Sequence, residues 1–237
     1  MQRIAIAPGQ KTGNLITFNT DQTHYLYRVL RLRDSDRVSV FDGSGQLWVV
    51  GLQGNQGHIL DNLTPNNELP AQVCLMVALT KGNGFEDVVR CCTELGVAEI
   101  MPVISDRCVA KPNPKRLDRW QRIATEAAEQ SERVKIPIIH PLRSWSASLS
   151  EVQTYQVKLI ASARYREKSL IAHLTSWANL GDQTIAIATG PEGGWTPTEI
   201  DHALTQNFQE VALGSRILRA VTAPIATMAV ISNLLEA

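Results

Sequence analysis

Short runs of alternating apolar and polar residues fill the first 70 positions of the chain. Glycine-rich turn signals separate these runs, at Asp42-Gly43-Ser44-Gly45 and at Gly54-Asn55-Gln56-Gly57. Alternation with a period of two is typical of strands that bury one face. Short strands joined by such turns favour a small β-barrel or sandwich. The expected strands are residues 15–18, 37–41, 46–52 and 58–60.

One short helix is expected to interrupt these strands. Thr20 or Asp21 could cap it, and apolar residues at helical spacing follow. His24, Arg28 and Arg31 have i, i+4, i+7 spacing, which places them on one helical face. That face could meet phosphates. It could equally be a solvated face balanced by nearby aspartates.

A second pattern begins after residues 61–71, a polar stretch with two prolines that is typical of a domain boundary. Buried strands then alternate with amphipathic helices, which predicts an α/β domain with a mostly parallel sheet. We expect a β domain over residues 1–70 and an α/β domain over residues 71–237. The expected strands are residues 73–79, 98–104, 136–139, 156–161, 184–189 and 211–213, and the expected helices are residues 85–95, 114–133, 169–177 and a last one from about residue 223.

Two of these strands run into glycine-containing loops that lead into helical patterns. The loops are Gly190-Pro191-Glu192-Gly193-Gly194 and Gly214-Ser215-Arg216. In a parallel sheet, loops of this kind gather at the carboxyl edge and form small-molecule sites. Glycine lets backbone groups approach a ligand closely, although a tight turn alone could also require it. Arg216 and Arg219 could bind an anion or form surface ion pairs.

Composition and charge narrow the classes of function. A zero net charge argues against a general polyanion binder. Charge is nevertheless uneven: residues 105–135 hold eight Lys/Arg against five Asp/Glu, whereas residues 180–237 hold two against six. A basic middle segment could therefore face phosphates. The N-terminus lacks the apolar core of a secretory signal, and the longest weakly charged run, residues 222–235, is too short to span a bilayer. We expect a cytoplasmic protein.

Other site motifs are weak. The four cysteines form no C-x-x-C pair and have no histidine at ligand spacing, so reduced thiols and no metal site are expected. Lys81-Gly82-Asn83-Gly84 invites a dinucleotide-binding interpretation, but Asp87 occupies the position of the third glycine. A flexible strand-to-helix turn is the favoured alternative there. No catalytic triad or carboxylate pair is evident.

Several motifs together resemble one family, the small-subunit ribosomal RNA uridine N3-methyltransferases. The resemblance covers nearly the whole chain. It rests on Gly190-Pro191-Glu192-Gly193-Gly194, Leu213-Gly214, Arg216-Ile217-Leu218-Arg219, Thr222-Ala223, His24, Arg28-Val29-Leu30-Arg31, Phe41-Asp42-Gly43, Thr93-Glu94-Leu95-Gly96-Val97, Arg107-Cys108 and Glu126-Ala127-Ala128-Glu129-Gln130-Ser131-Glu132-Arg133.

The resemblance implies a fold and a cofactor. The C-terminal domain would be an α/β-knot methyltransferase domain of the SPOUT class, with a trefoil knot that is an exception to unthreaded topologies. It would form a homodimer through the knot region and bind S-adenosylmethionine, without a metal. The implied cofactor-binding residues are Ile187, Thr189, Gly190, Pro191, Glu192, Gly193, Gly194, Leu213, Gly214, Ile217, Leu218 and Thr222.

The resemblance also implies an RNA substrate. The N-terminal domain would be PUA-like, and the target would be one uridine of 16S ribosomal RNA, free or within the small ribosomal subunit. The residues expected to contact RNA are Arg3, His24, Arg28, Arg31, Arg33, Arg107, Lys111 and Arg133.

Methylation of uracil N3 sets the requirements for catalytic residues. N3 must be unpaired to react, and negative charge builds on the flanking carbonyl oxygens as its proton leaves. A guanidinium would stabilise that charge. Arg219 is the first candidate and Arg216 the second, and Glu192 or water would accept the proton.

Two positions depart from the family pattern. Val221 stands where the family usually has Glu, within Arg-Thr-Glu-Thr-Ala, and Cys91 stands where Lys is common. The replaced carboxylate lies beside the cofactor loop. An RNA-binding factor with a lapsed methyltransferase site is therefore the alternative function, and a nicotinamide-dependent enzyme using Gly82 and Gly84 is a third.

Overall fold

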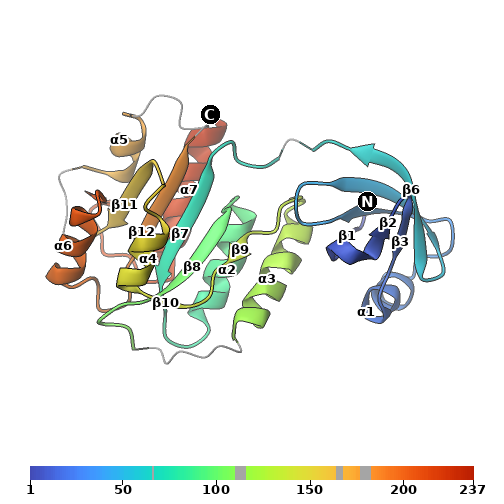
Figure 1. Ribbon diagram of the computed structural model, residues 1–237, viewed down its shortest axis with the longest axis horizontal. Coiled ribbons are helices and arrows are strands. Elements are labelled where there is room, and N and C mark those ends of the chain that lie inside the picture. Colours follow the sequence, from blue (N-terminus) through green and yellow to red (C-terminus); the bar gives the residue numbers. More distant parts are fainter. Residues whose placement is uncertain (66, 110–115, 164–167, 177–182) are drawn as a thin grey trace. The chain divides into compact units, whose positions relative to one another are not determined.

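The chain forms two compact units in a computed structural model that describes residues 1–65, 67–109, 116–163, 168–176 and 183–237. The first unit comprises Met1–Glu68 together with Ala128–Ile136 (Figure 1). The second comprises Leu69–Ala127 and Pro137–Ala237. The sequence pattern gave no sign that residues 128–136 return to the first unit.

The first unit is built on a six-stranded sheet with strand order β1-β4-β5-β6-β3-β2. Among the described residues, β1 and β4 pair in parallel and the other pairs are antiparallel. Ile4 of the first strand in this order and Ile16 of the last strand but one share one buried cluster with Leu26, a helical residue. The sheet therefore curls around a single core. Its strands are β1 (Arg3–Ala5), β2 (Lys11–Thr12), β3 (Leu15–Thr17), β4 (Arg37–Phe41), β5 (Leu47–Gln53) and β6 (Gln56–Leu63), with a 3₁₀ turn η1 (Pro8–Gln10) after β1.

The helix of this unit has two parts, α1 (Thr20–His24) and a π-helix η2 (Tyr25–Val29). Its N-cap is Asn19, not the predicted Thr20 or Asp21: Asn19 and Gln22 form a reciprocal capping box. The predicted single face of His24, Arg28 and Arg31 is also wrong. The π-helix changes the residue spacing, and Arg31 lies beyond the helix end with a φ of 58°.

Residues 128–136 are tied to the first unit by a buried ion pair. The Arg133 side chain is only 4% exposed and donates to Glu68 Oε2 at 2.7 Å. Glu68 Oε1 accepts from the backbone N–H groups of Val134 and Lys135. A buried guanidinium is stable only when its charge is paired, so this contact fixes the segment that follows α3 (Arg116–Gln130).

The second unit is built on a seven-stranded sheet in which every pairing of the described residues is parallel. The strand order is β10-β8-β7-β12-β11-β13, with β9 pairing β8. The strands are β7 (Gln72–Ala78), β8 (Glu99–Ile104), β9 (Ile138–Ile139), β10 (Arg143–Ser144), β11 (Val157–Ala161), β12 (Thr184–Thr189) and β13 (Gln209–Val211).

Helices cover both faces of this sheet. Buried β7 residues alternate: Cys74, Met76 and Ala78 face a cluster shared with α4 and α6, while Val73, Leu75 and Val77 face the other side. On that other side α7 contacts α2 and α5. Figure 1 shows α4 and α7 on opposite faces. The helices are α2 (Gly84–Glu94), α4 (Trp145–Glu151), α5 (Leu170–Leu174), α6 (Pro197–Thr205) and α7 (Thr222–Glu236).

Several strand and helix ends differ from the predicted ones. The strand predicted at residues 211–213 is Gln209–Val211, because β11, which it pairs, ends at Ala161 opposite Val211. The helix predicted at residues 169–177 ends at Leu174, and its N-cap is Ser169. The predicted helix start at residue 114 and the end at residue 177 lie outside the described residues.

A polar network lies at the amino end of β8. Glu99 Oε2 is 2.6 Å from His140 Nε2, and Glu99 Oε1 accepts from the Tyr155 hydroxyl at 2.8 Å. The hydrogen bond from His140 holds the pKa of Glu99 below its ordinary 4.5, and the bond from Tyr155 adds to this against the effect of burial. Burial raises the pKa of Tyr155, so its hydroxyl stays protonated.

The network predicts an acid-sensitive contribution to stability. A lowered folded-state pKa makes Glu99 stabilising above about pH 4.5, and this contribution disappears as pH falls through the lowered pKa. The free energy of unfolding of wild type should exceed that of Glu99→Gln at pH 7, and the difference should shrink below pH 4.5. Urea titrations at several pH values measure this, with the more exposed Glu94→Gln as control. A difference that is constant from pH 7 to pH 3 would contradict the assignment.

Candidate functional site

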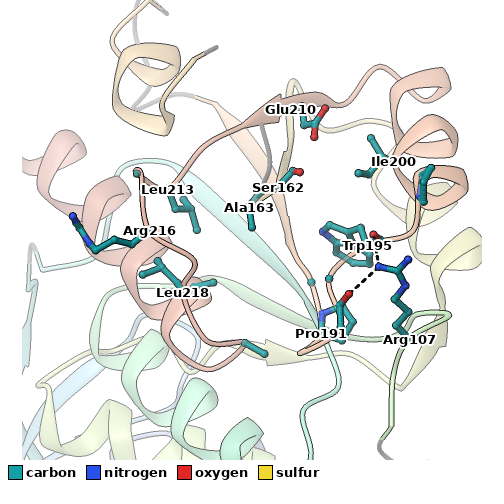
Figure 2. Close-up of a pocket in the computed structure, with 18 residues that line it drawn as sticks. Arg107, Ser162, Ala163, Pro191, Trp195, Ile200, Glu210, Leu213, Arg216 and Leu218 are labelled. Carbon is teal, nitrogen blue, oxygen red and sulfur yellow. Dashed lines mark hydrogen bonds between the residues drawn. The ribbon is translucent and has the colours of Figure 1, made fainter. Parts of the chain in front are cut away.

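A pocket of about 480 Å³ opens at the carboxyl ends of β11, β12 and β13. Parallel pairing brings these three ends to one sheet edge, as the loop pattern predicted. Figure 2 shows the lining side chains around the cavity. They come from the loop after β8, the ends of β11 and β13, the first glycine loop with the start of α6, and the segment between β13 and α7.

The first glycine loop, residues 190–194, forms the lower wall of the pocket in Figure 2. The Gly194 N–H donates to the Pro191 carbonyl at 2.9 Å, and Gly194 has a φ of 68°, a conformation that favours glycine. A Cβ on Gly190 would lie 3.2 Å from Trp195 Nε1. Both glycines therefore have a geometric role as well as a place in the pocket wall.

Two polar side chains hold this loop. Arg107 donates to the Gly193 carbonyl at 2.9 Å and to the Trp195 carbonyl at 3.4 Å (dashed in Figure 2). Glu192 accepts from the Lys81 N–H at 2.9 Å. The Glu192 carboxylate is thus engaged with the β7–α2 loop, and Glu192 is not among the residues that line the pocket.

The second loop, residues 212–221, forms the opposite wall. Leu213 and Leu218 line the pocket, and Gly214 has a φ of 114°. Arg216 lines it too, but its guanidinium extends away from the cavity (Figure 2). Ile217 is 81% exposed. The loop contributes apolar side chains and backbone to the pocket rather than a cation.

The third wall was not predicted. Ala161, Ser162, Ala163 and Glu210 line the pocket where β11 and β13 end. They follow or lie in strands that end at the same edge, and this proximity depends on a strand order that no local pattern shows. Among the described lining residues, Glu210 is the one carboxylate.

Packing behind the pocket fixes the start of α6. The Trp195 ring lies 4.5 Å from the Trp145 ring, and Trp145 Nε1 donates to the Glu199 carbonyl. Thr196 and Glu199 form a capping box, with Pro197 at the first helical position. This cap places Pro197 against the cavity.

The predicted cofactor residues divide into two groups. Seven line the pocket: Gly190, Pro191, Gly193, Gly194, Leu213, Gly214 and Leu218. The others do not: Ile187 and Thr189 are fully buried in β12, and Glu192, Ile217 and Thr222 are exposed. Arg219 is exposed beside the second loop and outside the lining.

The predicted RNA contacts are scattered. His24, Arg28, Arg31 and Arg33 are exposed on the first unit. The prediction for Arg133 is corrected, because its side chain is buried against Glu68. Arg107 holds the glycine loop, Arg3 donates to the Arg133 carbonyl at 3.1 Å, and Lys111 lies outside the described residues.

The described residues contain no group of three or more His, Cys, Asp or Glu side chains arranged to hold a metal ion. No helix in that part of the chain is long and apolar enough to cross a membrane. The turn at residues 81–84, considered above as a dinucleotide-binding motif, does not line the pocket.

Comparisons with known proteins identify the family. A model described as RNA methyltransferase domain matches residues 67–232, and one described as RNA methyltransferase PUA domain matches residues 18–54. A Synechocystis protein named Ribosomal RNA small subunit methyltransferase E is 43% identical over 99% of this chain and 78% of its own length. The chain belongs to this methyltransferase E family. The Bacillus subtilis protein of the same name is 30% identical over 90% of this chain and 87% of its own.

Solved structures of two methyltransferases share the fold. The Neisseria gonorrhoeae enzyme, bound to S-adenosyl methionine, matches with a TM-score of 0.88 and 32% identity over 99% of this chain and 98% of its own. A Legionella pneumophila methyltransferase in complex with the same cofactor matches with a TM-score of 0.84 and 26% identity, over 98% and 97% of the two chains. The α/β domain with a PUA-like domain is therefore confirmed, and the trefoil knot stays a prediction.

Val221, one of the two departures from the family pattern, has a packing role. A Cβ on Gly84 would lie 2.6 Å from Val221 Cγ2 and 3.1 Å from Thr80 Oγ1. Glycine at position 84 thus lets the start of α2 approach the segment that leads into α7. This contact explains the glycine at position 84 in the turn at residues 81–84 without a dinucleotide site.

The contact predicts that Gly84→Ala destabilises the protein. The added methyl overpacks a tight site and should cost about 2 kcal/mol. Val221→Ala should restore most of this loss in the double variant, because the two positions share one contact. Urea unfolding of the four proteins gives the coupling energy. Additive effects of the two substitutions would show that the contact is not decisive.

Proposed function

We propose that this protein transfers the methyl group of S-adenosylmethionine to N3 of a uridine in 16S ribosomal RNA. The observation that carries the proposal is the pocket between two glycine loops at the sheet edge. It lies in a chain of the methyltransferase E family, and a 32% identical member is bound to S-adenosyl methionine.

The residues present fit the cofactor. A pocket of about 480 Å³ is within the range for ligands of this size. Leu213, Leu218 and Ala220 offer apolar contact for a base, and the glycines expose backbone N–H and C=O groups. Ser162 and Glu210 add polar groups at another part of the wall (Figure 2). When bound, S-adenosylmethionine supplies an electrophilic methyl group.

The protein's task in this reaction is positioning and charge stabilisation. The target uridine must leave its base pair so that N3 is accessible. As the N3 proton passes to water, negative charge spreads over the two flanking carbonyl oxygens. That charge is neutralised when N3 takes up the methyl group, and the S–CH₃ bond of the donor would break to leave a neutral thioether. Arg219 is exposed beside the pocket loop and is our candidate for the cation that stabilises these oxygens.

Proton acceptance by Glu192 has little geometric support. Its carboxylate accepts from the Lys81 N–H and lies outside the pocket lining. Arg216 likewise extends away from the cavity. In this proposal water accepts the proton. Glu192 holds the first glycine loop, and Arg216 lies on the surface of the second loop.

The first unit supplies the RNA contacts in this proposal. It carries exposed cations at Arg28, Arg31 and Arg33 and the exposed imidazole of His24, and its central part matches the PUA domain model of RNA methyltransferases. The partner is 16S ribosomal RNA or the small ribosomal subunit, in the cytoplasm. The homodimer through the knot region is part of the same proposal.

Transfer of a labelled methyl group tests the proposed function directly. Purified protein, S-adenosylmethionine and small-subunit RNA or subunits should give N3-methyluridine on nucleoside mass spectrometry. Calorimetry measures whether the protein binds S-adenosylmethionine. This distinguishes an active enzyme from an RNA-binding factor with a lapsed methyltransferase site, because a lapsed site should not bind the cofactor. A product methylated elsewhere would refute N3 specificity while leaving methyl transfer intact.

Arg219→Ala is expected to lower the methylation rate by at least about a hundred-fold, the usual cost of removing one charge-stabilising group. Affinity for S-adenosylmethionine should change less than about two-fold, because Arg219 is outside the pocket lining. Single-turnover rates and calorimetry measure the two effects, with the exposed Arg122→Ala as control. An unchanged rate would remove Arg219 from the mechanism.

A further inference from the structure

A second cavity, in the first unit, has no part in the mechanism above. It measures about 790 Å³ and is open to solvent. The helix pair α1–η2 lines it with Thr20, His24, Tyr27 and Arg28, and the β5–β6 turn closes it with Asn55. Such a combination of an aromatic ring, a guanidinium, an amide and a hydroxyl suits a ligand with both a flat ring and an anionic group.

The aromatic ring in this cavity is held in place. The Tyr27 hydroxyl donates to Asp34 Oδ1 at 2.8 Å, and the same oxygen accepts from the Gly54 N–H at 2.9 Å. One carboxylate therefore joins the helix to the β5–β6 turn on either side of the cavity. Burial, with help from Asp34, raises the pKa of Tyr27 to about 12, so the hydroxyl remains a donor.

The helix that carries this ring is unusual. Tyr27 and Arg28 lie in η2, a π-helix, and single π-helical turns occur frequently at functional sites. Arg28 and His24 are both exposed. Neither has an ion pair with another residue in the part of the chain that the structure describes. The Arg28 guanidinium is thus available to an anion at the cavity.

We propose that this cavity binds one unpaired nucleotide of the RNA substrate, with the base against the Tyr27 ring and its phosphate at Arg28. Unpaired bases stack on aromatic side chains, and this contact tolerates any base. Guanidinium groups bind phosphate through paired donors. The site rests on the proposed function, since it assumes an RNA substrate.

Binding of a labelled single-stranded RNA of about eight nucleotides tests the site. Tyr27→Leu should weaken binding about ten-fold, and Tyr27→Phe, which keeps the ring, less than about two-fold. Arg28→Ala should weaken binding and reduce the salt slope by about one. Arg37→Ala, an exposed arginine of the same unit outside the cavity, is the matched control and should bind as wild type. A blunt RNA duplex should be insensitive to Tyr27→Leu.

Two results would overturn the nucleotide site: wild-type affinity in Tyr27→Leu, or equal losses in the Leu and Phe variants, which would indicate a structural role. If circular dichroism shows that Tyr27→Leu does not fold, the RNA affinities of Arg28→Ala and Arg37→Ala are compared instead. Equal affinity of those two variants counts against the site.

Methyl transfer to small-subunit RNA is measured in parallel. If the wild-type protein transfers methyl groups but RNA binding does not depend on Tyr27, the nucleotide site alone is refuted. If RNA binding depends on Tyr27 but the wild-type protein transfers no methyl group, the proposed function alone is refuted.

Discussion

Parallel pairing of β12 between β7 and β11 is the constraint on which the second unit depends. Its register brings Thr189, Ala161 and Val211 to one edge of the sheet. All three chain segments must leave the sheet there, so their loops converge. Residues from positions 107 to 223 reach one pocket for this reason. The site is a consequence of strand order rather than of any single motif.

Backbone conformation, more than side-chain chemistry, shapes this pocket. Gly194 and Gly214 adopt positive φ, and Gly190 leaves room for the Trp195 ring. The charged groups nearby act mainly on the protein itself: Arg107 binds loop carbonyls, and Glu192 binds a backbone N–H. Much of this wall is glycine backbone, and a wall of this kind places few demands on neighbouring side chains.

Local patterns predicted most of the fold and part of the site. Strand 184–189 was predicted to the residue, because its apolar run is buried on both faces. The glycine loops were found because their residue types are restricted. Arg133 was misassigned, since its partner Glu68 is 65 residues away and no local pattern shows that pairing. Ser162 and Glu210 were missed for the same reason: their role depends on which strands are neighbours, and that is a property of the whole sheet.

Two long-range contacts of the second unit have a kinetic consequence. Glu192 meets Lys81 across 111 positions, and Val221 meets Gly84 across an even longer interval. Chain closure over such intervals is slow, and folds rich in distant contacts reach their native state late. The ligand cavity is therefore completed only when nearly the whole unit has come together. Any molecule that occupies it binds the finished fold alone and protects the entire unit, not just the loops it touches, against unfolding.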